Sequence, residues 1–337
     1  MKIPVLKKYI TKKELVVIIV DILFLLMWFI DAFYQQINAS DYKEYYDVYN
    51  GLKANYFELG YYWLGVLFRS VGIPYFGYRM FLVTVTLLLM RNSILKYSKY
   101  PIYITVLYSF YPFMLQCIQM RNALTMSIII FSLRYLKQDE KQPVKFIGLM
   151  IIGLLFHSTT ILYFILVLML IVSYKWLIRF SIVIIPLLEV VLYFFKYEIA
   201  YFLSEVLHQY RILYYFEQGK NVFLTKSMLV YLFLFVIVVY LYKKQEEVNF
   251  NTTLLVSSAL ILTYIPLMIV HYDYYRIYEF YFPVIFTAIT NALNEDNRKD
   301  KIIKYGLMIL FACITFYLSI SWIQNTQMVL HNNILFK

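Results

Sequence analysis

Charged residues are scarce in this chain of 337 residues: Asp, Glu, Lys and Arg make up 15% of it, against roughly 25% in soluble globular proteins. Hydrophobic residues make up 62%, and the mean hydropathy is +0.66. An ordinary soluble fold is therefore excluded. Cysteine is scarce too, since Cys117 and Cys313 are the two in the chain and lie in different segments. A disulfide framework is not indicated.

Several motifs that carry well-known chemistry are also absent. The chain has no Walker-type glycine loop, no His-Glu-x-x-His, no cysteine-rich metal site and no Gly-x-Ser-x-Gly. The segments predicted to be external contain no Asp-x-Asp pair of the kind that holds a divalent ion. We therefore expect no metal and no cofactor. The net charge of +11 is divided among short clusters between apolar runs, so we expect no nucleic-acid partner.

Apolar runs recur along the whole chain, and their length of roughly 20 residues suits helices that cross a bilayer. The alternating pattern of membrane β-barrels is not seen. We predict an all-α, polytopic helical membrane protein with about 11 transmembrane helices, forming a single integral membrane domain over residues 1–337. The predicted spans are 14–34, 75–95, 101–118, 121–136, 144–156, 158–173, 177–195, 226–242, 252–270, 279–293 and 302–323.

Two stretches allow more than one interpretation. The first apolar run follows a lysine-rich start and has no small-x-small cleavage site after it, so we expect an uncleaved helix rather than a signal peptide. Basic residues flank both ends of 144–173, which favours two short helices that turn at His157 and Ser158. One long tilted helix is the alternative.

Lysine fixes the predicted orientation. With a cytoplasmic N-terminus, 16 lysines face the cytoplasm and 6 lie outside, as the positive-inside rule requires. Arginine does not follow this bias, because five arginines fall at or near the outer side: Arg69, Arg79, Arg121, Arg211 and Arg276. All four histidines also come out external. Planar guanidinium groups suit phosphate or carboxylate, so this external set indicates a binding task.

The largest external segments are 35–74 and 196–225. In the first, an acidic and tyrosine-rich stretch leads into an amphipathic helix near 58–71, which we expect to lie in the membrane interface. Glu58 stands at the start of that helix, where the helix dipole favours a carboxylate. An ordinary helix-start residue is the alternative interpretation of Glu58.

His157 interrupts an apolar run together with three hydroxyl residues, and a helix kink or an active-site turn would each account for it. Arg121 begins a predicted helix at the outer boundary. It is either an interface anchor or, with the free N–H groups of the helix start, a phosphate cradle. Arg79, one turn inside its helix, and Arg211, in the loop 196–225, are weaker candidates for the same task.

The stretch "IVHYDYYRIYEFYFP", residues 269–283, gathers several polar groups into one short external turn, namely His271, Asp273, Arg276 and Glu279. An aromatic belt with a snorkelling arginine explains its tyrosines but not this combination. We therefore predict that it contributes to a binding site. Within the membrane, Asp21 and Glu189 are ionisable and costly, and neither is assigned a role. Pairing with a neighbouring helix is one interpretation of Asp21, and a structural or a site-facing position are the two interpretations of Glu189.

The order of the motifs resembles that of the EpsG family of bacterial exopolysaccharide proteins, which are related to the Wzy-type polysaccharide polymerases. An acidic external stretch and "ELGYYWL" are followed by "RNALTMSIIIFSLRYL", "GLLFHSTTILYFILVLML" and "YYRIYEFYFP". The resemblance covers about residues 15 to 290. Where the family more often has Glu-Pro-Gly-Tyr, this chain has Glu58-Leu59-Gly60-Tyr61.

The resemblance implies a metal-independent membrane glycosyltransferase of the C-type architecture, located in the bacterial plasma membrane with its active site on the external side. Such an enzyme joins oligosaccharide repeat units carried on undecaprenyl pyrophosphate. By motif, Glu58 and His157 become the candidate catalytic residues, and Arg121 and Arg276 the principal substrate-binding residues. Either His157 or Glu58 would take the acceptor proton, and binding of pyrophosphate is the alternative role of His157. The implied partners are these lipid-linked glycans, membrane lipids, a flippase and a chain-length regulator.

Three alternative functions are weighed. A flippase for lipid-linked oligosaccharides needs polar groups along a path near the midplane, often between repeated halves, and the candidate groups here collect outside. A glycan ligase usually carries one large external domain, whereas the loop 196–225 is modest. An acyltransferase would account for His157 but leaves the external arginines unexplained.

Overall fold

The computed structural model describes residues 11–35, 40–54, 57–207, 226–245, 247–270, 272–293, 297–321, 327 and 329–333. Among these residues the regular secondary structure is entirely helical, apart from one isolated bridge between Tyr34 and Asn333. The predicted all-α class is confirmed. The chain divides into two compact units. Unit 1 comprises residues 1–132, 148–161 and 294–337, and unit 2 comprises residues 133–147 and 162–293.

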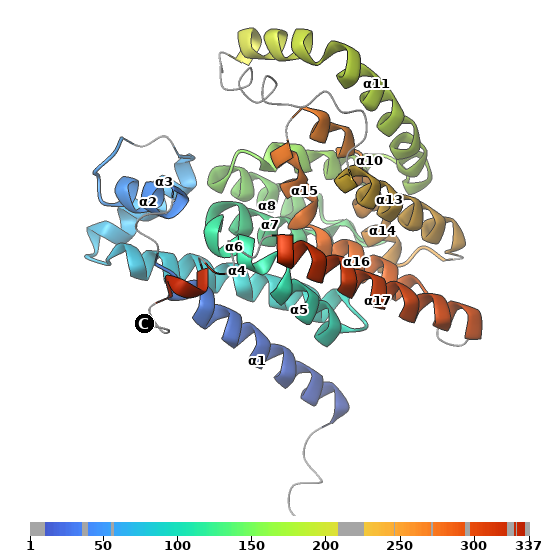
Figure 1. Cartoon of the computed structure of the whole chain (residues 1–337), viewed down its shortest axis with the longest axis horizontal. Coiled ribbons are helices and arrows are strands. Elements are labelled where there is room, and N and C mark those ends of the chain that lie inside the picture. The colour runs from blue at the N-terminus through green and yellow to red at the C-terminus, as the bar shows by residue number, and fades with distance from the viewer. Residues whose placement is uncertain are drawn as a thin grey trace, which may run out of the picture. The chain divides into compact units, whose positions relative to one another are not determined.

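Unit 1 is built mainly from helices that precede residue 133, joined by a late helix (Figure 1). They are α1 (Lys12–Ala32), α2 (Ser40–Tyr49), α3 (Leu59–Ser70), α4 (Tyr75–Tyr97), α5 (Pro101–Phe110), α6 (Phe113–Ile118), α7 (Met120–Ser132) and α17 (Arg298–Ser321). Helix α4 packs against α1 and α7, and α2 lies beside α3. A capping box starts α1, because Thr11 accepts from the Glu14 amide at 3.2 Å and Glu14 accepts from the Thr11 amide at 2.6 Å.

The predicted span 101–118 is interrupted. Helix α5 ends at Phe110, Tyr111 is extended, and α6 begins at Phe113. The cause is Pro112, which has no backbone N–H and disfavours a helical conformation in the residue before it. The short helix α6 then leads through Gln119 into α7, which carries Arg121.

The stretch 144–173 contains a break, which agrees with two short helices and rules out one continuous helix. Helix α8 (Pro143–Phe156) begins in unit 2 and ends in unit 1. A turn at 157–159 follows, and α9 (Thr160–Tyr163) begins after it. The last stretch is a 3-10 turn, η2 (Phe164–Val167), and a short helix, α10 (Leu168–Ile171).

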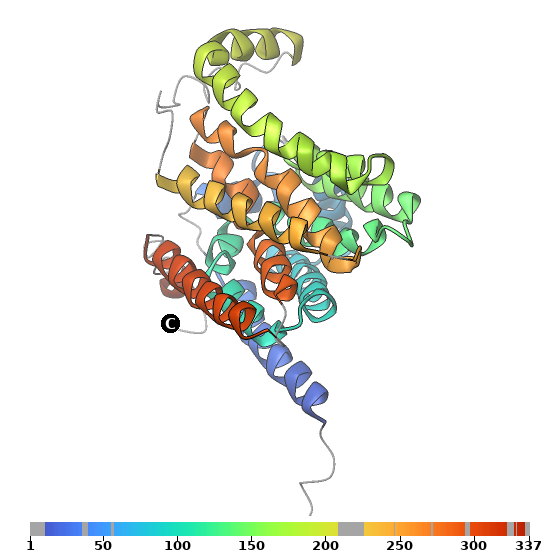
Figure 2. The ribbon, with the colours of Figure 1, turned by 90° about the vertical axis from the view of Figure 1, so that its right-hand side faces the viewer.

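Unit 2 contains the remaining helices. They are η1 (Leu133–Leu136), α11 (Tyr174–Leu207), α13 (Lys226–Lys244), α14 (Phe250–Leu262), η3 (Ile265–Ile269), η4 (Tyr272–Tyr275), α15 (Arg276–Glu279) and α16 (Phe282–Ala292). Helix α14 forms the core of the unit and packs against α11, α13 and α16. Figure 2 shows the bend in α11, where Phe195 has non-helical torsions. The predicted external segment 196–225 therefore begins as helix up to residue 207, and the rest lies outside the described residues.

Five helical segments in the described part of the chain are long and apolar enough to cross a membrane: Lys12–Ala32, Tyr75–Tyr97, Tyr174–Phe202, Phe250–Ile269 and Arg298–Ile320. Shorter apolar helices occupy Pro101–Phe110, Pro143–Phe156, Thr160–Ile171 and Phe282–Ala292. The structure thus supports a helical membrane protein, while the count of about 11 spans stays a prediction. Asp21 of α1, which the sequence left unassigned, forms an ion pair with Arg91 of α4.

Candidate functional site

Three of the predicted site residues meet in unit 1, although they lie far apart in the chain. Glu58 precedes α3, Arg121 occupies the first turn of α7, and His157 begins the turn after α8. Glu58 forms an ion pair with Arg121 and lies within hydrogen-bond distance of His157. Their side chains are 19%, 14% and 21% exposed, respectively, so the cluster is shielded but still open to solvent. We call Glu58, Arg121 and His157 the Glu–Arg–His cluster.

Glu58 is the central member of this cluster. One carboxylate oxygen, Oε2, accepts from the Arg121 guanidinium. The other, Oε1, accepts from the backbone N–H of Ser158 at 2.7 Å and lies 3.2 Å from Nδ1 of His157. Glu58 is the N-cap residue of α3, but its side chain makes no capping hydrogen bond there. The carboxylate is thus engaged by α7 and the turn after α8, instead of by its own helix.

The backbone around Glu58 explains the local sequence pattern. Glu58 is extended, with φ −62° and ψ 148°, and Leu59 is the first helical residue. A proline is tolerated at that first position and requires an extended residue before it. The Glu-Pro-Gly-Tyr pattern and the Glu58-Leu59-Gly60-Tyr61 of this chain are therefore compatible with the same backbone.

Gly60 brings the start of α3 close to the end of α8. A Cβ atom at this position would lie 2.8 Å from both Cβ and the carbonyl oxygen of Leu155. Such a contact is too close for any side chain, so only glycine allows this approach. Glu58 lies two residues before Gly60, and His157 lies two residues after Leu155. The contact between Gly60 and Leu155 therefore sets the separation between Glu58 and His157.

The turn that carries His157 is fixed by backbone hydrogen bonds. The His157 amide donates to the Gly153 carbonyl at 3.0 Å. The His157 carbonyl accepts from the Thr160 hydroxyl at 2.6 Å and from the Thr160 amide at 3.1 Å. The Thr125 hydroxyl of α7 donates to the same Gly153 carbonyl at 3.3 Å. The Thr160 hydroxyl in this run and the Thr125 hydroxyl of α7 thus stabilise the turn, and the imidazole is left to contact Glu58.

Arg121 lies against aromatic rings. Its guanidinium carbon is 4.1 Å from the ring centre of Phe57, 5.3 Å from that of Tyr45 and 5.6 Å from that of Tyr61. Such cation–π contacts are worth about 0.5–2 kcal/mol each, depending on exposure. They hold the guanidinium beside Glu58 in one orientation. The sequence interpretation selected no single tyrosine and did not select Phe57, although its place next to Glu58 was an available signal.

The electrostatics of Glu58 follow from these contacts. Burial raises the pKa of the Glu58 carboxyl, but the hydrogen bond from His157, the charge of Arg121 and the Ser158 amide together lower it to about 2. Glu58 lies outside the candidate membrane spans. It is therefore ionised throughout the physiological pH range, and a carboxylate this acidic is a poor proton acceptor near neutrality.

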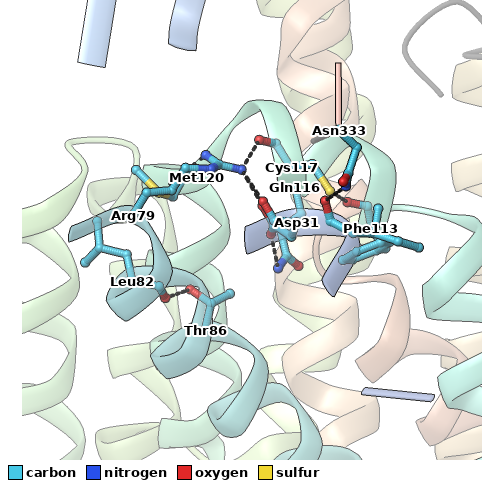
Figure 3. Close-up of polar contacts among 10 residues, drawn as sticks. Asp31, Arg79, Leu82, Thr86, Phe113, Gln116, Cys117, Met120 and Asn333 are labelled. Carbon is cyan, nitrogen blue, oxygen red and sulfur yellow. Dashed lines mark hydrogen bonds and ion pairs between the residues drawn. The ribbon is translucent and has the colours of Figure 1, made fainter. Parts of the chain in front are cut away.

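Arg79 lies in a different environment from Arg121. Its side chain is 1% exposed and forms an ion pair with Asp31, which is 2% exposed (Figure 3). The guanidinium of Arg79 contacts Asp31, Cys117 and Met120 and lies over the rings of Tyr34 and Tyr42, and not against Glu58 or His157. The sequence interpretation missed Asp31, although an ionisable residue inside an apolar run was the available signal.

The remaining predicted site residues belong to unit 2 or lie outside the described residues. Arg276 and Glu279 are in α15, and Glu279 is buried. The backbone of Asp273 lies in η4. The Tyr163 hydroxyl donates to the Ile277 carbonyl at 3.0 Å, which anchors this segment within unit 2. His271 and Arg211 lie outside the described residues.

Within the described ranges, no group of three or more His, Cys, Asp or Glu side chains is arranged to hold a metal ion. Independence from metal stays a prediction, as do the predicted roles of the site residues.

Comparison with known proteins gives one match. The family profile described as the EpsG family matches residues 17–333. No curated protein and no solved structure matches the chain.

Proposed function

Because the chain belongs to the EpsG family, whose members are Wzy-type polysaccharide polymerase-like membrane proteins, we propose that it is a repeat-unit polymerase. Its proposed substrates are oligosaccharide repeat units carried on undecaprenyl pyrophosphate, and the proposed site of reaction is the outer side of the plasma membrane. The observation that carries the proposal is the Glu–Arg–His cluster, in which a base, an anion that orients it and a guanidinium lie together.

In the proposed reaction, a sugar hydroxyl of one lipid-linked unit attacks the anomeric carbon of a second glycan chain. A new C–O bond forms, the bond from the anomeric carbon to the phosphate oxygen breaks, and its electron pair leaves with undecaprenyl pyrophosphate. His157 accepts the hydroxyl proton. Such a base contributes about 10²–10⁴-fold to a rate.

The contacts of His157 support this role over that of Glu58. With Nδ1 donating to the Glu58 carboxylate, the imidazole is held in the tautomer that leaves the Nε2 lone pair for the substrate. A base oriented by a third group is the usual arrangement for proton transfer to a protein side chain. Glu58, whose pKa of about 2 makes it a poor base, then serves as the orienting anion.

Arg121 is the proposed donor to the departing diphosphate. It carries a fixed positive charge beside His157, and aromatic faces restrain its plane. A preorganised donor to developing charge is worth roughly 3–4 kcal/mol. Arg276, with Asp273, His271 and Arg211, is proposed to bind the carrier or the glycan. This part of the proposal rests on the sequence pattern alone.

The test uses purified protein in nanodiscs with a defined undecaprenyl-pyrophosphate repeat unit and no added metal. We expect a ladder of polymer lengths, and we expect His157→Ala to lose it while inserting normally. Ser158→Ala is the matched control, because it keeps the backbone N–H that binds Glu58. A full-length ladder from His157→Ala would defeat the assignment of the base.

The same system separates the rival functions. Lipid-linked sugar that crosses the bilayer without a change in length would indicate a flippase. Transfer of preformed polymer to an acceptor, with no extension of repeat units, would indicate a ligase. Either result would replace the polymerase proposal.

A further inference from the structure

The buried ion pair of Arg79 and Asp31 reaches beyond its own two helices. Arg79 comes from α4 and Asp31 from the last turn of α1. Besides the Asp31 carboxylate, the guanidinium donates to the carbonyl oxygens of Asp31 and Cys117, both at 3.0 Å. It also contacts the sulfur of Met120 at 3.7 Å (Figure 3). One side chain therefore ties α1 and α4 to the junction between α6 and α7.

The position of these contacts in the junction is important. Cys117 lies in the last turn of α6, where carbonyl groups lack partners within the helix and need other donors. Met120 is the first residue of α7, and Arg121, the cation of the Glu–Arg–His cluster, directly follows it. A guanidinium that holds both sides of the junction therefore fixes the backbone from which Arg121 extends.

Asp31 is itself held in place by further contacts. Its second carboxylate oxygen accepts from the side-chain amide of Gln116 in α6 at 3.4 Å, and Gln116 accepts in turn from the Tyr108 hydroxyl. The Asn333 side chain donates to the Ile30 carbonyl at 2.7 Å, beside Asp31. These contacts fix the position of the Asp31 carboxylate, so it does not shift with the guanidinium when Arg79 is replaced.

We infer that Arg79 and Asp31 are positioning residues that set the place of Arg121 through the α6–α7 junction. Arg79 touches no reacting group in this arrangement and is not a substrate-binding residue. The catalytic consequence rests on the proposed polymerase function, whereas the structural consequence does not. A guanidinium is required, because its planar fork reaches several acceptors at once and the point charge of a lysine does not.

Arg79→Lys tests the inference, and Arg91→Lys is its matched control. Arg91 lies on the same helix, and its guanidinium pairs with Asp21 on the same partner helix α1 instead of with the α6–α7 junction. We expect faster backbone hydrogen exchange over residues 113–125 in Arg79→Lys and unchanged exchange there in Arg91→Lys. Equal exchange in both variants would overturn the inference.

Activity provides the second readout. A displacement of about 1 Å can cost about 10²-fold in rate, so we expect a loss of that order in kcat for Arg79→Lys, with less change in KM. In an Arg121→Lys background, the same substitution is expected to change the rate by no more than about twofold, because Arg79 acts through Arg121. A further loss of about 10²-fold in that background would contradict the inference.

A paired substitution guards against simple misfolding. Asp31→Leu with Arg79→Met removes the charges together, and apolar replacement of a buried ion pair is often neutral for stability. We expect this protein to accumulate, to exchange faster at 113–125 and to polymerise slowly; wild-type exchange there would overturn the inference. If the wild type forms no polymer, the proposed function fails, and the exchange comparison still decides whether Arg79 positions the junction.

Discussion

Unit 1 contains two arginine–carboxylate pairs that meet α7 at adjacent residues. The Arg79–Asp31 pair contacts Met120, and the other pair consists of Arg121 itself and Glu58. The two pairs differ in almost every other respect. Arg79 and Asp31 are enclosed, and the guanidinium has acceptors from α1, α6 and α7. Arg121 and Glu58 remain partly exposed, share their contact with an imidazole, and are bordered by aromatic faces. The first pair has the contacts of a structural element and the second those of a binding site.

The difference shows why residue type alone does not identify a functional arginine. Both arginines stand near the start of a helix, and both were candidates for binding phosphate. Removing one partner of a fully buried ion pair leaves an uncompensated charge, whereas water can still reach the remaining charge of a partly exposed pair. The comparison requires substitutions in the Arg79–Asp31 pair to affect mainly stability and substitutions in the Glu–Arg–His cluster to affect mainly activity.

The largest effect is expected for the base. His157→Ala should lower the polymerisation rate by about 10²–10⁴-fold and change the thermal unfolding temperature little. Rates of ladder formation in nanodiscs, set beside a melting curve of the same sample, measure both quantities. A large fall in melting temperature together with the rate would mean that His157 has a structural role.

The enclosed pair should dominate stability. Asp31→Ala is expected to destabilise the protein by about 3–5 kcal/mol, because it leaves the Arg79 charge buried and uncompensated. Arg121→Lys should leave the melting temperature nearly unchanged and lower activity by about 10²–10³-fold through loss of the fork. Reversal of this order, with Arg121 controlling stability and Asp31 without effect on it, would break the comparison.

Gly60 should affect activity through distance. Gly60→Ala forces α3 away from Leu155, so we expect a loss of about tenfold or more in rate as Glu58 moves from His157. Gly148→Ala is the matched control, since a Cβ there meets nothing within 4 Å and alanine favours a helix by up to about 1 kcal/mol. Equal activity of the two alanine variants would show that the α3–α8 approach does not control the cluster.

The smallest effect concerns pH. The pKa of Glu58 is about 2 in the folded protein and 4.5 in its ordinary state, so its contribution to stability is complete above about 4.5 and is lost as pH falls towards about 2. The wild-type melting temperature should therefore fall more steeply below pH 4.5 than that of Glu58→Gln. Glu44→Gln, in the exposed ion pair with Lys53, should keep the wild-type slope.

Much of this organisation could be predicted from the sequence. Apolar runs predict the helices. Glu58 and Arg121 stand out because each begins a predicted helix on the external side, and His157 stands out because it interrupts an apolar run. Their contacts could not be predicted, since 63 residues separate Glu58 from Arg121 and 99 separate it from His157. Nothing in a linear pattern specifies which of several external arginines a given carboxylate meets.

Other features were visible but were not used. Pro112 marks the end of α5, yet the predicted helix ran from 101 to 118 through it. Asp31 was treated as part of an apolar span, although a carboxylate there requires a partner. The narrow contact at Gly60 could not be foreseen, because the close approach of Leu155 depends on how α3 and α8 pack.

The tie between Asn333 and the end of α1 has a consequence for how the protein is made. Asp31 leaves the ribosome 48 residues before Arg79, a delay of roughly 2–10 seconds at ordinary rates of synthesis. The Asn333 side chain, which bonds the carbonyl beside Asp31, arrives only 303 residues after its partner. Helix α1 must therefore keep its Asp31 carboxylate unmatched until α4 has been made, and the contact with Asn333 can form only later still.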